Sequence, residues 1–205
     1  SLVGWVQVFF HIFRLLYTRM PYPKMLVVEM GTDRPGDIAY LTHMCRPDVA
    51  VLTAISPEHY EYFKSMERLE FEEKNIVRAL PATGVAILNG DDARVMGESD
   101  TIPVRTMTYG FGEHVDVRVT STSMVRENQS VRGMEFGFRM GTRSLEARVD
   151  GVIGAQHGYA LSAAAAVGLY FEMKDADIEK GLSQYRAAPG RMRLIDGVKN
   201  TTIID

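Results

Sequence analysis

Three short apolar runs in the first half of the chain, each followed by polar residues, constrain the fold more than any other feature. The runs cover residues 25–28, 49–53 and 85–88, are rich in valine and leucine, and are separated by helix-length segments. Strands that alternate with helices are typical of βαβ units, whose parallel strands are covered on both faces. We therefore predict an α/β fold with a mostly parallel, Rossmann-like sheet flanked by helices.

The rest of the chain predicts the elements that complete this fold. Residues 57–80 have the spacing of one helix, and a further strand is predicted at 103–109. Residues 113–150 alternate apolar and polar side chains, which indicates a small three-stranded antiparallel sheet set on the main domain. Helices are predicted at 156–171 and, with Asp175 or Asp177 as N-cap, up to residue 185, followed by a hairpin over 192–204. We expect residues 1–205 to form a single domain.

The segment 2–17 is the most apolar part of the chain and allows two interpretations. A membrane-spanning helix needs about 20 apolar residues, and Gln7, His11 and Arg14 interrupt this shorter run. No basic leader or small-residue cleavage site accompanies it, so neither a membrane span nor a signal peptide is predicted. A helix on a membrane surface is the alternative. We favour a helix packed on the sheet, which would bury Trp5, Phe9, Ile12 and Phe13.

Charge and cysteine content exclude several classes of protein. The 205 residues carry a formal net charge of -3, which gives no general attraction to nucleic acid. Cys45 is the one cysteine of the sequence, so an internal disulfide framework and a cysteine-rich metal site are both excluded. A single thiol suits a reducing compartment, and we expect a cytoplasmic protein.

Polar side chains follow each of the three apolar runs. Glu29 ends the first run, His59 follows the second after a short loop, and Asn89 ends the third, directly before Asp91 and Asp92. The carboxyl ends of parallel strands lie at one edge of a sheet, where ligands bind. Carboxylate and imidazole groups there would suit Mg²⁺ or Mn²⁺. Taken singly, His59 is more often a helix cap or surface residue, and the Asp91–Asp92 pair is typical of turn and cap chemistry.

These residues lie in blocks that strongly resemble the central, ATP-binding domain of the Mur ligases. Within the family the closest likeness is to the branch that adds D-alanyl-D-alanine to a UDP-muramoyl tripeptide. The matching blocks occur in family order and spacing from about Tyr22 onward, and they are residues 28–39, 46–53, 59–65, 80–92, 154–164 and 189–192. A small β-meander between the fourth and fifth blocks is also a feature of the family.

The resemblance implies an ATP-dependent amide ligase of peptidoglycan synthesis. In such enzymes ATP phosphorylates a carboxylate, and an amine then attacks the acyl phosphate, with Mg²⁺ neutralising phosphate charge. Glu29 and His59 match the Mg²⁺ ligands of the family. Arg191 matches an arginine near the ATP phosphates. Asn89 lies in a block on the nucleotide side of the sheet, and the resemblance implies that it also binds ATP. The implied partners of the complete enzyme are a UDP-muramoyl peptide and a D-amino-acid dipeptide.

One departure from the family concerns the phosphate-binding loop. No Gly-x-x-x-x-Gly-Lys-Ser/Thr segment occurs in these 205 residues. In the family this loop lies upstream of Glu29, the UDP-binding domain precedes it, and an amine-binding domain follows the end of this sequence. We therefore expect a central domain truncated at both ends that is inactive by itself.

Two further departures affect single site residues. The family has a lysine, carbamylated and bridging to Mg²⁺, in the helix after His59. Spacing without gaps places Glu73 there, and a shift of one residue would restore Lys74. The sequence Gly154-Ala-Gln-His157 replaces a Gly-Arg-His-Asn block, so the resemblance implies only a limited adenine contact for His157, since a neutral imidazole offers one donor and one acceptor.

Two other functions remain open at this level. One alternative within the superfamily is a ligase that adds glutamate to folate, although residues 29–36 favour the cell-wall branch. A different class is a noncatalytic interaction module that kept the fold, with the apolar start of the chain as its contact surface.

Overall fold

The computed structural model describes residues 2–17, 23–57, 60–97, 99, 102–127 and 130–205. The chain divides into two bodies, residues 1–30 and residues 31–205, which are treated separately below. In the first body, α1 (Leu2–Tyr17) is a helix, as predicted. Its aromatic side chains are exposed, among them Trp5 and Phe9 at 65% each, with Phe13 at 61% and Ile12 at 46%. Nothing that the structure describes within residues 1–30 covers these four side chains, so their predicted packing on the sheet stays a prediction.

The strand predicted at 25–28 is also absent, since residues 25–30 form neither strand nor helix. Val27 is 90% exposed, and Glu29 is exposed as well. A short apolar run such as 25–28 is able to form a strand. The strand itself needs hydrogen bonds from a neighbour, and no such neighbour pairs with 25–28 in the described chain.

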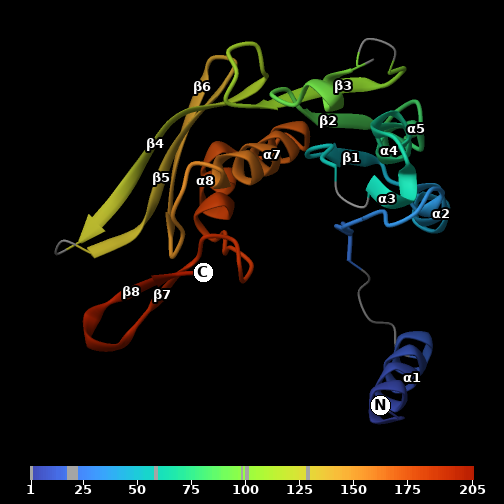
Figure 1. The fold of residues 1–205 in the computed structure, drawn as a ribbon, viewed down its shortest axis with the longest axis horizontal. Coiled ribbons are helices and arrows are strands. Elements are labelled where there is room, and N and C mark those ends of the chain that lie inside the picture. The colour runs from blue at the N-terminus through green and yellow to red at the C-terminus, as the bar shows by residue number, and fades with distance from the viewer. Residues whose placement is uncertain (1, 18–22, 58–59, 98, 100–101, 128–129) are drawn as a thin grey trace. The chain divides into compact units, whose positions relative to one another are not determined.

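The second body carries the sheet and its helices (Figure 1). Its elements in chain order are α2 (Asp37–Met44), β1 (Val49–Leu52), α3 (Tyr60–Phe63), α4 (Met66–Glu73), α5 (Asn75–Arg78), β2 (Val85–Asn89), α6 (Ala93–Met96), β3 (Arg105–Gly110), β4 (Val117–Glu127), β5 (Ser130–Met140), β6 (Arg143–Asp150), α7 (His157–Tyr170), α8 (Asp175–Ser183), β7 (Leu194–Asp196) and β8 (Thr202–Ile204). The α/β fold class is confirmed.

One sheet contains the first six strands in the order β1-β2-β3-β4-β5-β6. The strands β1, β2 and β3 are parallel, and β4, β5 and β6 form an antiparallel meander. The meander is joined to the parallel part because Tyr109 and Gly110 of β3 pair with Val117 and Arg118 of β4. The predicted three-stranded unit at 113–150 therefore exists, but as an extension of the main sheet. The strands β7 and β8 pair separately as the predicted hairpin.

The two faces of the parallel strands are covered by different helices. Val85 and Ile87 of β2 belong to a core that includes α7, while Ala86 and Leu88 belong to a second core with Leu52, Phe63 and Leu69. All five residues of β2 are buried. This double burial explains why the strand is a continuous apolar run. Figure 1 shows α7 along one side of the sheet and the short helices α3, α4 and α5 near β1 and β2.

The helix predicted over 57–80 is interrupted twice. Lys64 has a positive φ of 64°, and Ser65 then caps α4 by accepting a hydrogen bond from the Arg68 N–H. A second break at Lys74 separates α4 from α5. At α8 the N-cap is Lys174, so the predicted caps Asp175 and Asp177 lie in the first turn instead. Across the described chain no helix is long and apolar enough to span a membrane.

Candidate functional site

The carboxyl ends of β1, β2 and β3 lie at one edge of the sheet and are joined by side chains from the turn after β2. Asn89 is buried at the end of β2, and its Nδ2 donates to the Thr53 carbonyl oxygen at 2.8 Å, just beyond β1. Its Oδ1 accepts the Asp91 N–H at 3.0 Å. Both ends of this amide are thus engaged within the protein, and Asn89 fixes the spacing of the two strand ends.

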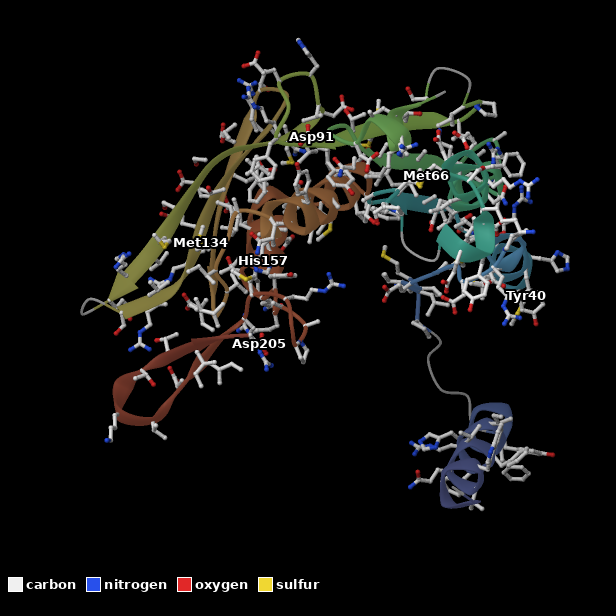
Figure 2. The ribbon with its side chains drawn as sticks, viewed as in Figure 1. Tyr40, Met66, Asp91, Met134, His157 and Asp205 are labelled. Atoms are coloured by element: carbon white, nitrogen blue, oxygen red, sulfur yellow. The ribbon has the colours of Figure 1, made fainter. Side chains whose placement is uncertain are left out.

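The two aspartates after Asn89 connect the same turn to its neighbours. Asp91, labelled in Figure 2, accepts hydrogen bonds from the Phe111 N–H at 2.6 Å and the Gly112 N–H at 2.9 Å, directly after β3. Asp92 caps α6 and also accepts the Ile55 N–H at 3.2 Å. Turn and cap chemistry, the alternative named from the sequence, is therefore what the structure shows for both residues. Carboxylates that accept several N–H groups hold loops firmly.

A cavity of about 370 Å³ opens beside this edge, in the body formed by residues 31–205. Its lining is polar and rich in oxygen atoms, and consists of Gly31, Thr32, Asp33, Asp37, Ala54, Ser56 and Glu73. The segment 54–56 follows β1, so the cavity lies where a parallel sheet of this kind binds ligands. Glu73, at the end of α4, is the acidic residue that this helix contributes to the lining.

Another part of the lining is a turn before α2, which is held by two carboxylates. Asp37 accepts hydrogen bonds from the Asp33 N–H at 3.0 Å and the Arg34 N–H at 2.8 Å. Glu72 is 5% exposed, and its Oε1 accepts the Ile38 N–H at 2.9 Å. The N-terminus of α2 is thereby tied to α4, which also carries Glu73. Glu72 was not singled out from the sequence, because nothing local distinguishes it from other glutamates on this acidic helix.

Lys74 lies in different surroundings from its neighbour Glu73. Its side chain is buried, and Nζ donates to Glu70 Oε1 at 2.5 Å and to the Gly97 carbonyl oxygen. It lines a smaller cavity of about 110 Å³ whose other walls are mainly apolar. Of the two candidates for the bridging role, the structure therefore brings Glu73 to the oxygen-rich cavity and places Lys74 elsewhere.

His157 begins α7 and is 4% exposed. Its Nδ1 is 3.1 Å from the Tyr185 hydroxyl, and the two rings pack edge to face. Burial lowers the pKa of His157, although the backbone at Met192 and Ile153 acts in the opposite direction. The adenine contact expected for His157 stays a prediction, and what the structure shows is a buried contact with Tyr185, a residue that sequence reasoning did not single out.

Of the remaining predicted site residues, Arg191 is described by the structure and His59 is not. Arg191 is exposed in the loop after α8. Burial raises the pKa of Tyr185, and the charge of Arg191 offsets part of this rise. His59 lies outside the described residues, so its predicted approach to Glu29 stays a prediction. Among the residues that the structure describes, no three His, Cys, Asp or Glu side chains gather closely enough to hold a metal ion.

Comparison with known proteins gives one family. A family model described as the Mur ligase middle domain matches residues 13–168. The UDP-N-acetylmuramoyl-tripeptide–D-alanyl-D-alanine ligase of Bacillus subtilis is 28% identical over 184 residues, covering 89% of this chain and 37% of that protein. The UDP-N-acetylmuramate–L-alanine ligase of Aquifex aeolicus is also 28% identical, covering 88% of this chain and 38% of that protein.

Solved structures agree on the fold. The MurF ligase from Thermotoga maritima in complex with ADP superposes with a TM-score of 0.78 at 24% sequence identity, covering 91% of this chain and 42% of that chain. The sequence thus spans about two-fifths of the length of the relatives that it matches.

Proposed function

Because the chain belongs to the family of Mur ligase middle domains, we propose that it is the part of an ATP-dependent amide ligase that binds ATP and Mg²⁺. We further propose that this ligase acts in the cytoplasm and adds D-alanyl-D-alanine to a UDP-muramoyl tripeptide. The names of the Bacillus subtilis and Escherichia coli relatives state this activity for those proteins.

The observation that carries the proposal is the oxygen-rich cavity at the carboxyl edge of the sheet. Its lining includes the carboxylates of Asp33, Asp37 and Glu73 and the hydroxyl of Ser56. Mg²⁺ is bound through one or two carboxylates, with waters and substrate phosphates as its other ligands. The residues present fit such an ion, which would neutralise charge on the phosphate oxygens when bound.

In the proposed reaction, a carboxylate oxygen of the peptide attacks the γ-phosphorus of ATP, and ADP leaves. The amine nitrogen then attacks the carbonyl carbon of the acyl phosphate, loses a proton, and inorganic phosphate leaves. We assign Glu29 and His59 as side chains that would hold the metal, and Glu73 as the carboxylate that would take the place of the family's carbamylated lysine. Arg191 would hold phosphate oxygens, since a planar guanidinium pairs with two of them at once. Asn89 keeps the strand ends at the spacing that this site needs.

A nuclear magnetic resonance titration of the ¹⁵N-labelled chain with MgADP tests the proposal. We expect amide shifts, at millimolar nucleotide, in residues 31–33, 54–56, 73 and 189–193, and a weaker response in Arg191→Lys. Glu135→Gln is the matched control, because Glu135 is exposed on β5, away from the cavity. Shifts confined to other surfaces, or none at all, would contradict the assignment and favour a noncatalytic module.

A further inference from the structure

His157 and Tyr185 lie 28 residues apart in sequence and join two segments that contact the loop carrying Arg191. His157 begins α7. Tyr185 follows Gln184, the C-cap of α8, and stands immediately before residues 186–193, here named the arginine loop. The 3.1 Å contact between His157 Nδ1 and the Tyr185 hydroxyl links the start of one helix to the end of the other. Figure 2 labels His157 at the start of α7.

The arginine loop is held at its far end by backbone hydrogen bonds. The Ile153 N–H donates to the Met192 carbonyl oxygen at 3.0 Å, and the Leu194 N–H donates to the Gly151 carbonyl oxygen at 2.9 Å. Ile153 and Gly151 belong to the segment that leads into α7, so the loop is docked on the residues just before His157. Within the loop, the Arg191 N–H donates to the Ala188 carbonyl oxygen at 3.2 Å.

Because His157 is buried, its hydrogen bond with Tyr185 should contribute to the stability of this region. His157 is buried, and its Nε2 has no hydrogen-bond partner of good geometry among the described residues. The backbone at Met192, in the arginine loop, and at Ile153 nevertheless acts to raise the pKa of the ring. A buried polar group is costly unless it is hydrogen-bonded, and the Tyr185 hydroxyl is the side-chain partner that the structure gives this ring. Burial raises the pKa of the Tyr185 hydroxyl, and the positive charge of Arg191 acts in the opposite direction.

We propose that His157 and Tyr185 are positioning residues, which dock the arginine loop on the start of α7 and thereby hold Arg191 toward the nucleotide phosphates. This inference rests on the proposed function for the role of Arg191, but the docking of the loop can be measured without nucleotide. His157 acts here through Tyr185. His157 is buried and Tyr185 is partly buried, whereas Arg191 is exposed.

Hydrogen exchange on the full chain tests the docking. Tyr185→Phe removes the hydroxyl and keeps the ring, so the exchange rates of the Ile153, Arg191 and Leu194 amides should rise roughly two- to tenfold, as expected for one lost hydrogen bond. Tyr170→Phe is the matched control, since Tyr170 ends α7, about 20 Å along the helix from His157. Its effect on these three amides should be negligible.

Variants at His157 separate hydrogen bonding from packing. Asn offers a polar atom near the position of Nδ1, so His157→Asn should keep much of the protection, whereas His157→Leu should lose it. In the Tyr185→Phe background, His157→Asn should change the exchange rates little further. Where His157→Leu does not fold, the Tyr185→Phe and His157→Asn pair still decides.

Nucleotide binding provides the second readout. Tyr185→Phe should weaken MgADP binding by a similar factor, and should have no such effect in an Arg191→Ala background. Loop exchange in Tyr185→Phe equal to that of wild type and Tyr170→Phe would overturn the positioning role. If exchange rises as expected while Arg191→Ala leaves MgADP binding unchanged, the docking stands and the phosphate role proposed for Arg191 is wrong.

Discussion

Glu73 and Lys74 are neighbours in sequence whose side chains enter different surroundings. Glu73 lines the oxygen-rich cavity with Asp33 and Ser56, while Lys74 Nζ donates to Glu70 and to the Gly97 carbonyl oxygen. The metal role proposed for Glu73 and the role of Lys74 in holding α4 to the end of α6 therefore concern adjacent residues. The two roles predict different consequences of substitution.

Lys74→Met should lower the free energy of unfolding without affecting metal binding. The substitution removes the donor for Glu70 and for Gly97, and leaving such partners unpaired costs about 1–3 kcal/mol. Chemical denaturation measures this loss. Lys180→Met is the control because Lys180 is exposed on α8, and it should change the stability by less than about 0.5 kcal/mol. Equal stabilities of the two variants would show that the buried Lys74 contacts contribute little.

Asp91→Ala should destabilise the sheet edge. The Phe111 and Gly112 N–H groups lose their acceptor, and bonds to a charged group contribute about 1.5–3 kcal/mol each as measured by substitution. We expect a net loss of about 1–3 kcal/mol in denaturant unfolding, less than the sum of two such bonds, because both are solvent-exposed and water replaces part of each. Asp48→Ala, an exposed aspartate just before β1, serves as the comparison. A loss no larger than that of Asp48→Ala would contradict the anchoring role of Asp91.

Because of His157, the free energy of unfolding should fall as the pH is lowered below about 6.5. Burial lowers its pKa in the folded chain, so the unfolded chain takes up a proton first as the pH falls below about 6.5. The stability of wild type should then fall with pH until the lowered folded pKa is reached, and should be fully present above the unfolded pKa. The groups near the ring are the Tyr185 hydroxyl and, beyond it, Arg191. His157→Asn should lack this component in urea unfolding at pH 5–8; identical pH profiles would refute it.

The sequence predicted the parallel strands and the meander because their patterns of burial are local. In β2 every residue is buried, and in β6 buried and exposed residues alternate. The predictions of secondary structure failed where the local pattern did not decide the structure. Residues 25–28 have a strand pattern but no strand neighbour in the described chain, and the helix over 57–80 is broken by the positive φ of Lys64.

In the candidate site, too, local spacing predicted one residue correctly, while a contact between distant residues was not predicted. Counting residues from His59 favoured Glu73 over Lys74, and the structure brings Glu73 to the cavity because the helix places neighbouring side chains about 100° apart. The contact between His157 and Tyr185 spans 28 residues of sequence. No local pattern indicates such a pair, since each residue alone looks like an ordinary core side chain.

The isolated 205-residue chain should bind MgATP only weakly, with a dissociation constant in the millimolar range. The residues assigned here to metal and phosphate, Glu29, His59 and Arg191, make only part of the contacts that ATP needs. Calorimetry measures the affinity directly, and a micromolar dissociation constant would contradict this expectation. Addition of a segment that carries a phosphate-binding loop should raise the affinity.

The most direct test of the metal assignment is paramagnetic relaxation by Mn²⁺ in the ¹⁵N-labelled chain with ATP present. Mn²⁺ accepts the same oxygen ligands as Mg²⁺ and broadens nearby amide signals. The assignment predicts selective broadening of residues 31–33, 54–56 and 73, lost in Glu73→Gln and retained in Lys74→Met and Glu135→Gln. Broadening that avoids these residues, or that survives unchanged in Glu73→Gln, would contradict the claim that Glu73 faces the metal.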